Sequence, residues 1–159
     1  MVNTEFSESV WAYPRPPALK KELRPIKVEF SGEIIAKSIN CYRVLETSHP
    51  PSFYIPLADV ASSFLVKSDS DSFCEWKGVA KYWHVKVGEK VALNAAWAYE
   101  NPNSPFLPIK AYFSFYANAV DSCWVGDERV SAQDSSFYGG WVTSEIVGPF
   151  KGGPGTNSW

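Results

Sequence analysis

Apolar and polar residues alternate along much of this chain, and that pattern predicts β-strands. Ile26, Val28 and Phe30 alternate with Lys27 and Glu29, which places the three apolar side chains on one face of a half-buried strand. Similar alternation or aromatic runs predict further strands at residues 33–37, 43–46, 52–56, 63–68, 79–86, 90–99, 109–116 and 122–125. No long stretch has helical periodicity. We therefore expect a mainly β, compact single domain of antiparallel strands with little helix, arranged as a curved sheet, a sandwich or a β-tent-like barrel.

Glycine and proline positions predict how the strands are connected. Gly88 and Glu89 separate residues 79–86 from residues 90–99, which predicts a β-hairpin. The second strand of this hairpin is expected to place four residues on one face: Val91, Leu93, Ala95 and Trp97. Another hairpin is predicted after residues 122–125. Polar or proline-rich composition predicts irregular loops at residues 68–72 and 101–108, and a single helical turn is predicted at residues 56–61.

The length of 159 residues suits one domain. We divide the chain into a proline-rich N-terminal arm at residues 1–24, a β domain at residues 25–137, and a glycine- and proline-rich tail at residues 138–159. Two alternatives are open for the arm: Trp11 and Tyr13 lie in a surface groove, or the arm is a disordered leader. In the tail, three aromatic residues are candidate anchors on the parent domain or on a neighbouring subunit: Trp141, Phe150 and Trp159.

Charge and composition narrow the expected partners. The net charge of −2 gives no reason to expect nucleic acid or an anionic membrane surface. No apolar stretch approaches the roughly 20 residues that a membrane-spanning helix needs, and acidic residues stand where a signal peptide has a basic segment. Three widely separated cysteines, an odd number, do not resemble a disulfide framework. These features together predict a reduced, cytoplasmic protein.

The densest polar chemistry lies between Arg43 and Pro56. Within this stretch Glu46 is positioned to orient His49 as a general base, while Arg43 and Ser48 are candidate contacts for an anionic ligand. The residues are also consistent with a structural alternative, in which Glu46 pairs with Lys77 and satisfies loop amides while His49 caps a turn. The Pro-Pro step that follows His49 stiffens the chain at this point.

A second candidate segment contains Cys74 and Lys77. Lys77 is a candidate anion-binding group, and it is placed to lower the pKa of the Cys74 thiol and make it a nucleophile. The alternative is a buried, inert thiol that packs beside Trp76. Aromatic residues are candidate pocket walls, namely Tyr54, Tyr82 and Trp97, with Trp83 and Tyr99 as further candidates. Because adjacent residues of a strand face opposite ways, only one of Tyr82 and Trp83 can line a given pocket.

The sequence contains little that indicates a metal-binding or a phosphate-binding site. The carboxylates Asp69 and Asp71 have a metal-binding spacing but lie in a serine-rich segment that we interpret as solvated. The cysteines are too far apart for paired zinc ligands, and no Walker-type phosphate loop occurs. We therefore predict no metal site, and the sequence identifies no cofactor.

Several motifs together resemble the DUF427 family, which is also labelled nucleotidyltransferase-like, over roughly residues 26–120. The motifs are Ala36-Lys-Ser, Leu45-Glu46, Pro50-Pro51 with Tyr54-Ile-Pro56, Asp59-Val60, Cys74-Glu-Trp-Lys77-Gly78, Tyr82-Trp83, Ala95-Ala-Trp97 with Tyr99, and Phe115-Tyr116. The arm and the tail resemble a longer form of the family that is common in cyanobacteria and plants. Glu75 and His84 depart from the family pattern, which has proline and a small polar residue there. The resemblance implies a small, mostly antiparallel β domain and no particular reaction.

Three functions remain open at this point. The first is binding of a small anionic or planar ligand in an aromatic-walled polar pocket. The second is an enzyme in which His49 and Glu46 act as an acid–base pair while Lys77 and Arg43 bind an anion. The third is a structural module that forms an oligomer, such as a homodimer, through the arm and the tail.

Overall fold

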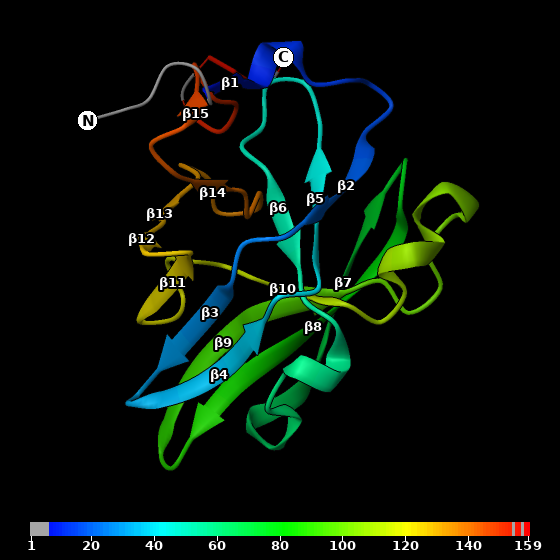
Figure 1. Cartoon of the computed structure of the whole chain (residues 1–159). Helices are drawn as coiled ribbons and strands as arrows, with labels where there is room; N and C mark the ends of the chain where they lie inside the picture. The colour runs from blue at the N-terminus through cyan, green and yellow to red at the C-terminus, as the bar shows by residue number, and fades with distance from the viewer. Residues whose placement is uncertain (1–6, 154, 157) are drawn as a thin grey trace.

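The computed structural model describes residues 7–153, 155–156 and 158–159, and it confirms the mainly β, antiparallel architecture (Figure 1). The strands are β1 (Glu8–Ser9), β2 (Ala18–Glu22), β3 (Ile26–Phe30), β4 (Glu33–Ser38), β5 (Cys41–Leu45), β6 (Ser52–Tyr54), β7 (Leu65–Cys74), β8 (Gly78–Val87), β9 (Lys90–Ala98), β10 (Phe113–Phe115), β11 (Ser122–Val125), β12 (Glu128–Arg129), β13 (Ser131–Ala132), β14 (Trp141–Val142) and β15 (Ile146–Val147). Short 3-10 helices are η2 (Val10–Ala12), η3 (Leu57–Asp59), η4 (Ser62–Phe64) and η5 (Ser104–Ile109).

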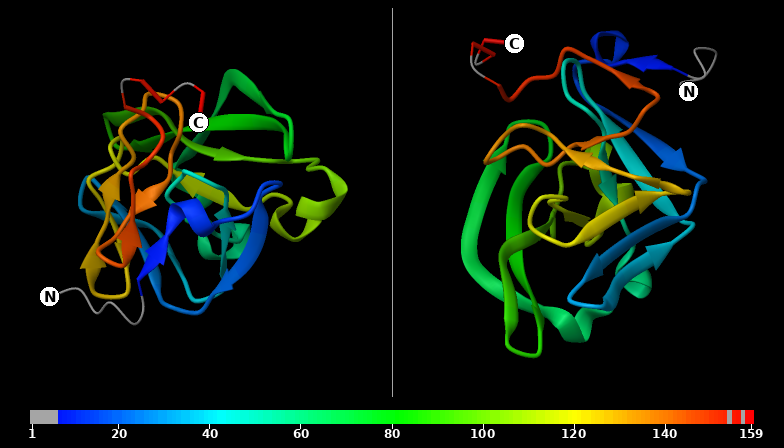
Figure 2. Two further views of the ribbon diagram at one scale, coloured as in Figure 1. Left: turned by 90° about the horizontal axis from the view of Figure 1, so that it is seen from above. Right: turned by 90° about the vertical axis from the view of Figure 1, so that its left-hand side faces the viewer.

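Two four-stranded sheets and one three-stranded sheet form the body of the molecule. Their strand orders are β10-β9-β8-β7, β12-β11-β3-β4 and β2-β5-β6. Figure 2 shows strands β7–β9 and strands β3–β4 on opposite sides of the body. The three sheets stay separate among the described residues, so the barrel alternative is not realised. Between β6 and β10, backbone hydrogen bonds of 2.8 Å in both directions join Ile55 and Phe113 and link two of the sheets.

Strand β3 follows the predicted alternation. Ile26, Val28 and Phe30 are buried, while Lys27 and Glu29 are partly exposed. These three apolar side chains belong to the main core, which lies between the sheets and contains Phe53, Val85, Phe115 and Trp141 among others. A second, more aromatic core cluster consists of Val44, Tyr54, Ala80, Tyr82, Trp97, Tyr99, Phe106 and Ile109. Apolar burial in these clusters is the main force that stabilises the fold.

The predicted loop at residues 68–72 is wrong, because this segment lies within strand β7. Asp71 pairs with Lys81 of β8, and Ser72 pairs with Ala80. The register shifts between Lys67 and Asp71, which is a bulge in the strand. Polar side chains are compatible with a strand here because β7 lies at the edge of its sheet and most of its residues remain exposed.

The predicted hairpin of β8 and β9 is confirmed, but the predicted common face of β9 is wrong. Val91 and Leu93 are exposed, whereas Ala95 and Trp97 are buried. Asn94 has a φ of 49°, and the ladder register shifts opposite it, between Trp83 and Val85. A bulge of this kind moves the following side chains to the other face, so residues on either side of Asn94 no longer share one.

The segment from residue 101 to residue 116 differs from the prediction in two ways. Residues 101–108, predicted as a loop, contain most of η5. The strand predicted at residues 109–116 is reduced to β10, because Ile109 ends η5 and Ala111 takes a φ of 59°. The predicted helical turn at residues 56–61 is present as η3, and the hairpin after residues 122–125 is formed by β11 and β12.

The predicted arm and tail pack on the same chain. β2 pairs with β5 along its whole length, and β1 pairs in parallel with β15. The ring of Trp11 lies 5.1 Å from that of Trp159, and its Nε1 donates to the Pro149 carbonyl at 2.8 Å. Residues 1–6 of the arm and residues 154 and 157 of the tail lie outside the described residues. No helix in the described part of the chain has the length and apolar character that crossing a membrane requires.

Candidate functional site

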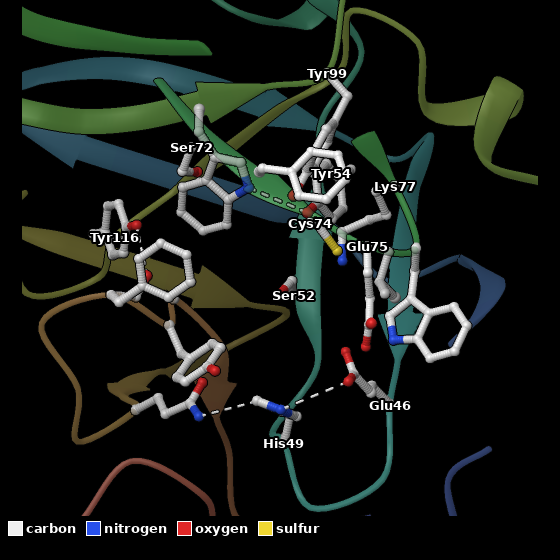
Figure 3. A pocket seen from close by; sticks show the side chains of 18 of the residues that line it. Glu46, His49, Ser52, Tyr54, Ser72, Cys74, Glu75, Lys77, Tyr99 and Tyr116 are labelled. Carbon is white, nitrogen blue, oxygen red and sulfur yellow. Dashed lines mark hydrogen bonds and ion pairs between the residues drawn. The ribbon is translucent and has the colours of Figure 1, made fainter. Parts of the chain in front are cut away.

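A cavity of about 190 Å³ lies where the segment between β5 and β6 meets the turn between β7 and β8 (Figure 3). Strands β8 and β9 contribute aromatic side chains to one wall, and the segment between β13 and β14 covers another. Because β8 alternates, Tyr82 faces this cavity, while Trp83 packs against Phe113 at 4.8 Å on the side of the main core. This confirms that only one residue of the adjacent pair lines the pocket.

Most of the predicted site residues come together at this cavity. Seven of the nine line it, namely Glu46, His49, Tyr54, Cys74, Lys77, Tyr82 and Trp97. They come from segments that are distant in the sequence, and Figure 3 shows side chains from these segments pointing toward a common space. The two predicted segments, residues 43–56 and residues 74–83, therefore form one site.

Arg43 and Ser48, which were predicted to contact the ligand, do not line this pocket. The predicted site is wrong at these two residues. Strand alternation directs Val44 of β5 into the pocket and Arg43 to the opposite face. There the Arg43 guanidinium donates to both carboxylate oxygens of Glu8, at 2.9 and 3.1 Å. Ser48 is fully buried with a φ of 73°, and its carbonyl accepts from the Lys151 amide at 2.8 Å. Both residues hold the arm and the tail against the domain.

The contact with Gln133 determines which nitrogen of the neutral His49 ring carries the proton. The Gln133 Oε1 accepts from the Gly140 amide at 3.0 Å, so its Nε2 donates to the Lys151 carbonyl at 2.6 Å and faces His49 Nδ1 at 3.3 Å. His49 Nδ1 is therefore an acceptor, and the ring proton is on Nε2. That nitrogen lies 3.9 Å from the Glu46 carboxylate, and the dashed lines in Figure 3 mark both contacts of the ring.

His49 is neutral at neutral pH. Burial lowers the pKa of His49, and the positive charges of Lys151, Lys77 and Arg15 lower it further, to about 4. The ring also packs edge-on against Tyr138 with 4.7 Å between centroids. With Nδ1 hydrogen-bonded to Gln133 and Nε2 3.9 Å from the Glu46 carboxylate, the neutral His49 ring forms a polar wall of the pocket.

Lys77 places a buried cation in the pocket. Its relative exposure is 8%, and among the described residues no carboxylate lies within ion-pairing distance of its ammonium. The nitrogen lies 5.7 Å from the ring centre of Tyr99 and 5.9 Å from that of Phe106. Burial acts to lower the pKa of Lys77, but the Tyr54, Cys74 and Glu46 side chains outweigh it, and the pKa is raised. The ammonium is therefore charged at neutral pH.

Cys74 lies next to this cation. The thiol is half-buried and free of any disulfide, and its interaction with the Lys77 ammonium is one of the causes that raise the pKa of Lys77. Figure 3 shows the sulfur and the ammonium facing the same space. Among the described residues, no group of three or more histidine, cysteine, aspartate or glutamate side chains is arranged to hold a metal ion.

Phenol groups form much of the remaining polar surface of the pocket. The Tyr54 hydroxyl accepts from Trp97 Nε1 at 3.2 Å, and the Tyr82 and Ser72 hydroxyls share a hydrogen bond of 2.8 Å. Tyr116 donates to the Phe137 carbonyl at 2.7 Å. Burial is the largest cause that raises the pKa of Tyr54 and of Tyr116, so both phenols remain protonated near neutral pH.

Several pocket residues were not predicted from the sequence. Ser72 was assigned to a solvated loop, and the segment from Gln133 to Gly139 was assigned to the end of the domain and to the tail. One usable signal was the glycine pair at residues 139–140. A Cβ at Gly139 would lie 2.3 Å from the Trp97 ring, so only glycine allows this segment to approach the pocket wall so closely.

Comparison with known proteins supports the resemblance found in the sequence. A search of curated proteins found no match to this chain. A family model described as a domain of unknown function (DUF427) matches residues 18–126, which is more than half of the chain. This range includes β2 and the pocket residues up to Tyr116, and it excludes η2 and the segment around Gln133. The chain belongs to the DUF427 family.

Proposed function

We propose that the protein binds a small planar monoanion in the cavity around Lys77. The observation that carries this proposal is the buried Lys77 ammonium, which faces the cavity and has no carboxylate partner within 4.0 Å among the described residues. A buried charge is costly unless it is paired. An anionic group on a ligand would supply that pair and two or more charge-assisted hydrogen bonds.

Size and shape of the cavity limit the ligand to about one ring. A cavity of about 150 Å³ accepts benzene in a protein core, and this one measures about 190 Å³. Its walls include the Trp97 indole and the Tyr54 phenol, whose rings stand at 89° to each other. Flat rings pack favourably in stacked or edge-on contact with such walls.

The carboxylates of the pocket limit the charge of the ligand. Glu46 and the exposed Glu75 line the same cavity as Lys77. A dianion such as a phosphate monoester would be repelled by these groups more strongly than a carboxylate, which carries a single charge. We therefore infer that the preferred anionic group is a carboxylate, directed at Lys77 and away from the two glutamates.

Binding is favoured over acid–base catalysis by the arrangement of His49. A general base needs a nitrogen lone pair that is free to accept a proton from a substrate. The Nδ1 lone pair of His49 faces Gln133, and its Nε2 proton faces Glu46. The assembly role of the arm and tail has less support, because Trp11 and Trp159 are packed against each other within one chain.

Titration of the purified protein with benzoate, monitored by calorimetry, tests the proposal. We expect benzoate to bind at least tenfold more tightly than the neutral, equally shaped benzamide. Lys77→Met should remove at least tenfold in benzoate affinity, because a hydrogen bond to a charged group contributes about 1.5–3 kcal/mol. Lys86→Met is the matched control, since Lys86 is an exposed lysine of β8 outside the cavity. Equal binding of benzoate and benzamide, or unchanged benzoate affinity in a folded Lys77→Met protein, would refute the proposal.

A further inference from the structure

A second hollow adjoins the cavity around Lys77. Its volume is about 380 Å³, and it lies between strands β7 to β9, the segment after β10 and the segment after β13. The two hollows share four lining residues, Ser72, Tyr82, Tyr116 and Phe137. The two hollows therefore meet at these four side chains.

The chemistry of the second hollow differs from that of the first. Its lining is dominated by hydroxyl and amide side chains, which both donate and accept hydrogen bonds: Ser70, Ser72, Asn94, Asn118, Ser135 and Ser136. Its lining contains no lysine, arginine or histidine, and its one carboxylate, Asp71, lies 3.4 Å from the Lys81 ammonium. This surface suits a neutral group that carries several hydroxyls, because each hydroxyl is itself both donor and acceptor.

Two polar residues and one aromatic residue are available at the open side of this hollow. Asn118 and Ser136 are exposed, and their side chains make no hydrogen bond or ion pair among the described residues. Phe137 is 49% exposed and belongs to the shared wall. The apolar face of a sugar ring packs on such an aromatic ring, while its hydroxyls reach the neighbouring polar side chains.

We propose that the natural ligand is a glycoside of a small aromatic carboxylic acid, with the acid at Lys77 and the sugar in the second hollow. This inference rests on the proposed function, because it extends the same ligand beyond the first cavity. The shared wall is lined by the hydroxyls of Tyr82 and Ser72, which hydrogen-bond to each other at 2.8 Å. In the proposed complex these two hydroxyls would be the hydrogen-bond partners of the glycosidic oxygen that joins the two parts of the ligand.

Calorimetric titration with 4-hydroxybenzoate and with 3- and 4-carboxyphenyl β-D-glucopyranoside tests this inference. The two glucosides differ in the direction in which the sugar leaves the ring. We expect at least one of them to bind about tenfold more tightly than 4-hydroxybenzoate. The double variant Asn118→Ala/Ser136→Ala should weaken glucoside binding about fivefold and leave 4-hydroxybenzoate binding unchanged. Asn40→Ala is the control, because Asn40 is an exposed asparagine that lines neither hollow.

The outcomes separate this inference from the proposed function. If 4-hydroxybenzoate binds in a Lys77-dependent manner but neither glucoside binds more tightly, the sugar-binding inference is refuted and the proposed function stands. An equal loss of glucoside affinity in Asn40→Ala, or none in the double variant, also refutes it. If neither acid nor glucoside binds, both the proposed function and this inference are overturned.

Discussion

Replacing Arg43 with methionine removes the buried cation at the centre of a partly exposed charge network that joins the arm and the tail to the domain. The Arg43 guanidinium, whose side chain is 4% exposed, contacts Glu8 at 2.9 Å and Glu22 at 3.4 Å. Glu22 also pairs with Arg24 at 2.7 Å, and Arg24 pairs with Glu145 at 2.6 Å. Methionine has a similar length and no charge, so the change tests the charge more than the packing.

The expected loss of stability is about 3 kcal/mol. Removing one partner of a buried ion pair costs about 3–5 kcal/mol, because the other charge is left unpaired. Two features place Arg43→Met at the low end of this range. The Glu8 side chain is 30% exposed and regains contact with water, and Glu22 keeps its hydrogen bonds from Arg24. For a chain of this size, the loss corresponds to a decrease in Tm of roughly 6–12 °C.

The loss of stability should depend on pH. Burial opposes ionisation of Glu8 and Glu22, but hydrogen bonds from Arg43 and Tyr13 to Glu8, and from Arg24 to Glu22, outweigh it and lower both pKa values. A carboxyl whose pKa is lower in the folded state contributes stability above its unfolded pKa of about 4.3. That contribution disappears as the pH falls through the folded pKa. The difference between wild type and Arg43→Met should therefore be full at pH 7 and decrease below about pH 4.3.

Urea denaturation followed by tryptophan fluorescence at pH 7 and at several values down to pH 3 measures this difference. Arg15→Met is the control, because the Arg15 side chain is 41% exposed and lies 4.0 Å from Glu46. Such exposed pairs contribute about 0–1 kcal/mol. A loss below 1 kcal/mol for Arg43→Met at pH 7, or a loss that is the same at pH 7 and pH 3, would contradict the role assigned to this network.

Two further substitutions and one titration test other parts of the structure. Trp141→Ala should lower the free energy of unfolding by about 3–5 kcal/mol in urea denaturation, because Trp141 is fully buried and stacks on Phe53 at 4.9 Å. Gly140→Ala should lower it by about 1–3 kcal/mol, since the new Cβ would meet the Pro50 carbonyl at 2.4 Å, and a loss below 0.5 kcal/mol would contradict that contact. In an NMR titration, His49 should change protonation near pH 4, and a midpoint near the ordinary value of 6.5 would show that the ring is not enclosed as described.

Local strand patterns were predictable where a single face is buried, and less so where the backbone is irregular. The alternation of residues 26–30 led directly to β3, because one side of that strand packs on the core and the other is partly exposed. In β9 the same reasoning failed at Asn94, where a positive φ reverses the faces. Nothing in the alternation of β9 identifies a bulge, since it arises from pairing with β8.

The candidate site was also predictable only where it depends on local sequence. Residues in the two densest polar and aromatic segments, such as His49 and Lys77, do meet at one cavity. Arg43 was placed there because a bend after β5 was expected to bring it to the same side as Glu46, but its position in β5 directs it toward Glu8. Gln133 was missed because its role depends on a contact with residue 49, which is distant in the sequence. Such contacts depend on the tertiary fold rather than on local pattern.

The residues that line the pocket come from two parts of the chain, one inside and one outside the region that matches the family model. Lys77 and the aromatic walls at Tyr54 and Trp97 lie within residues 18–126, which match the family model. The segment that covers the cavity and the glutamine that orients His49 come after residue 126, and Lys151 holds that glutamine through its carbonyl. If the proposed function holds, the family domain would select the charge of the ligand and the later segments would set its size. Changes at Gly139, where a Cβ would meet the Trp97 ring of the pocket wall, should then alter which ring fits without removing the preference for an anion, and changes at Lys77 should do the reverse.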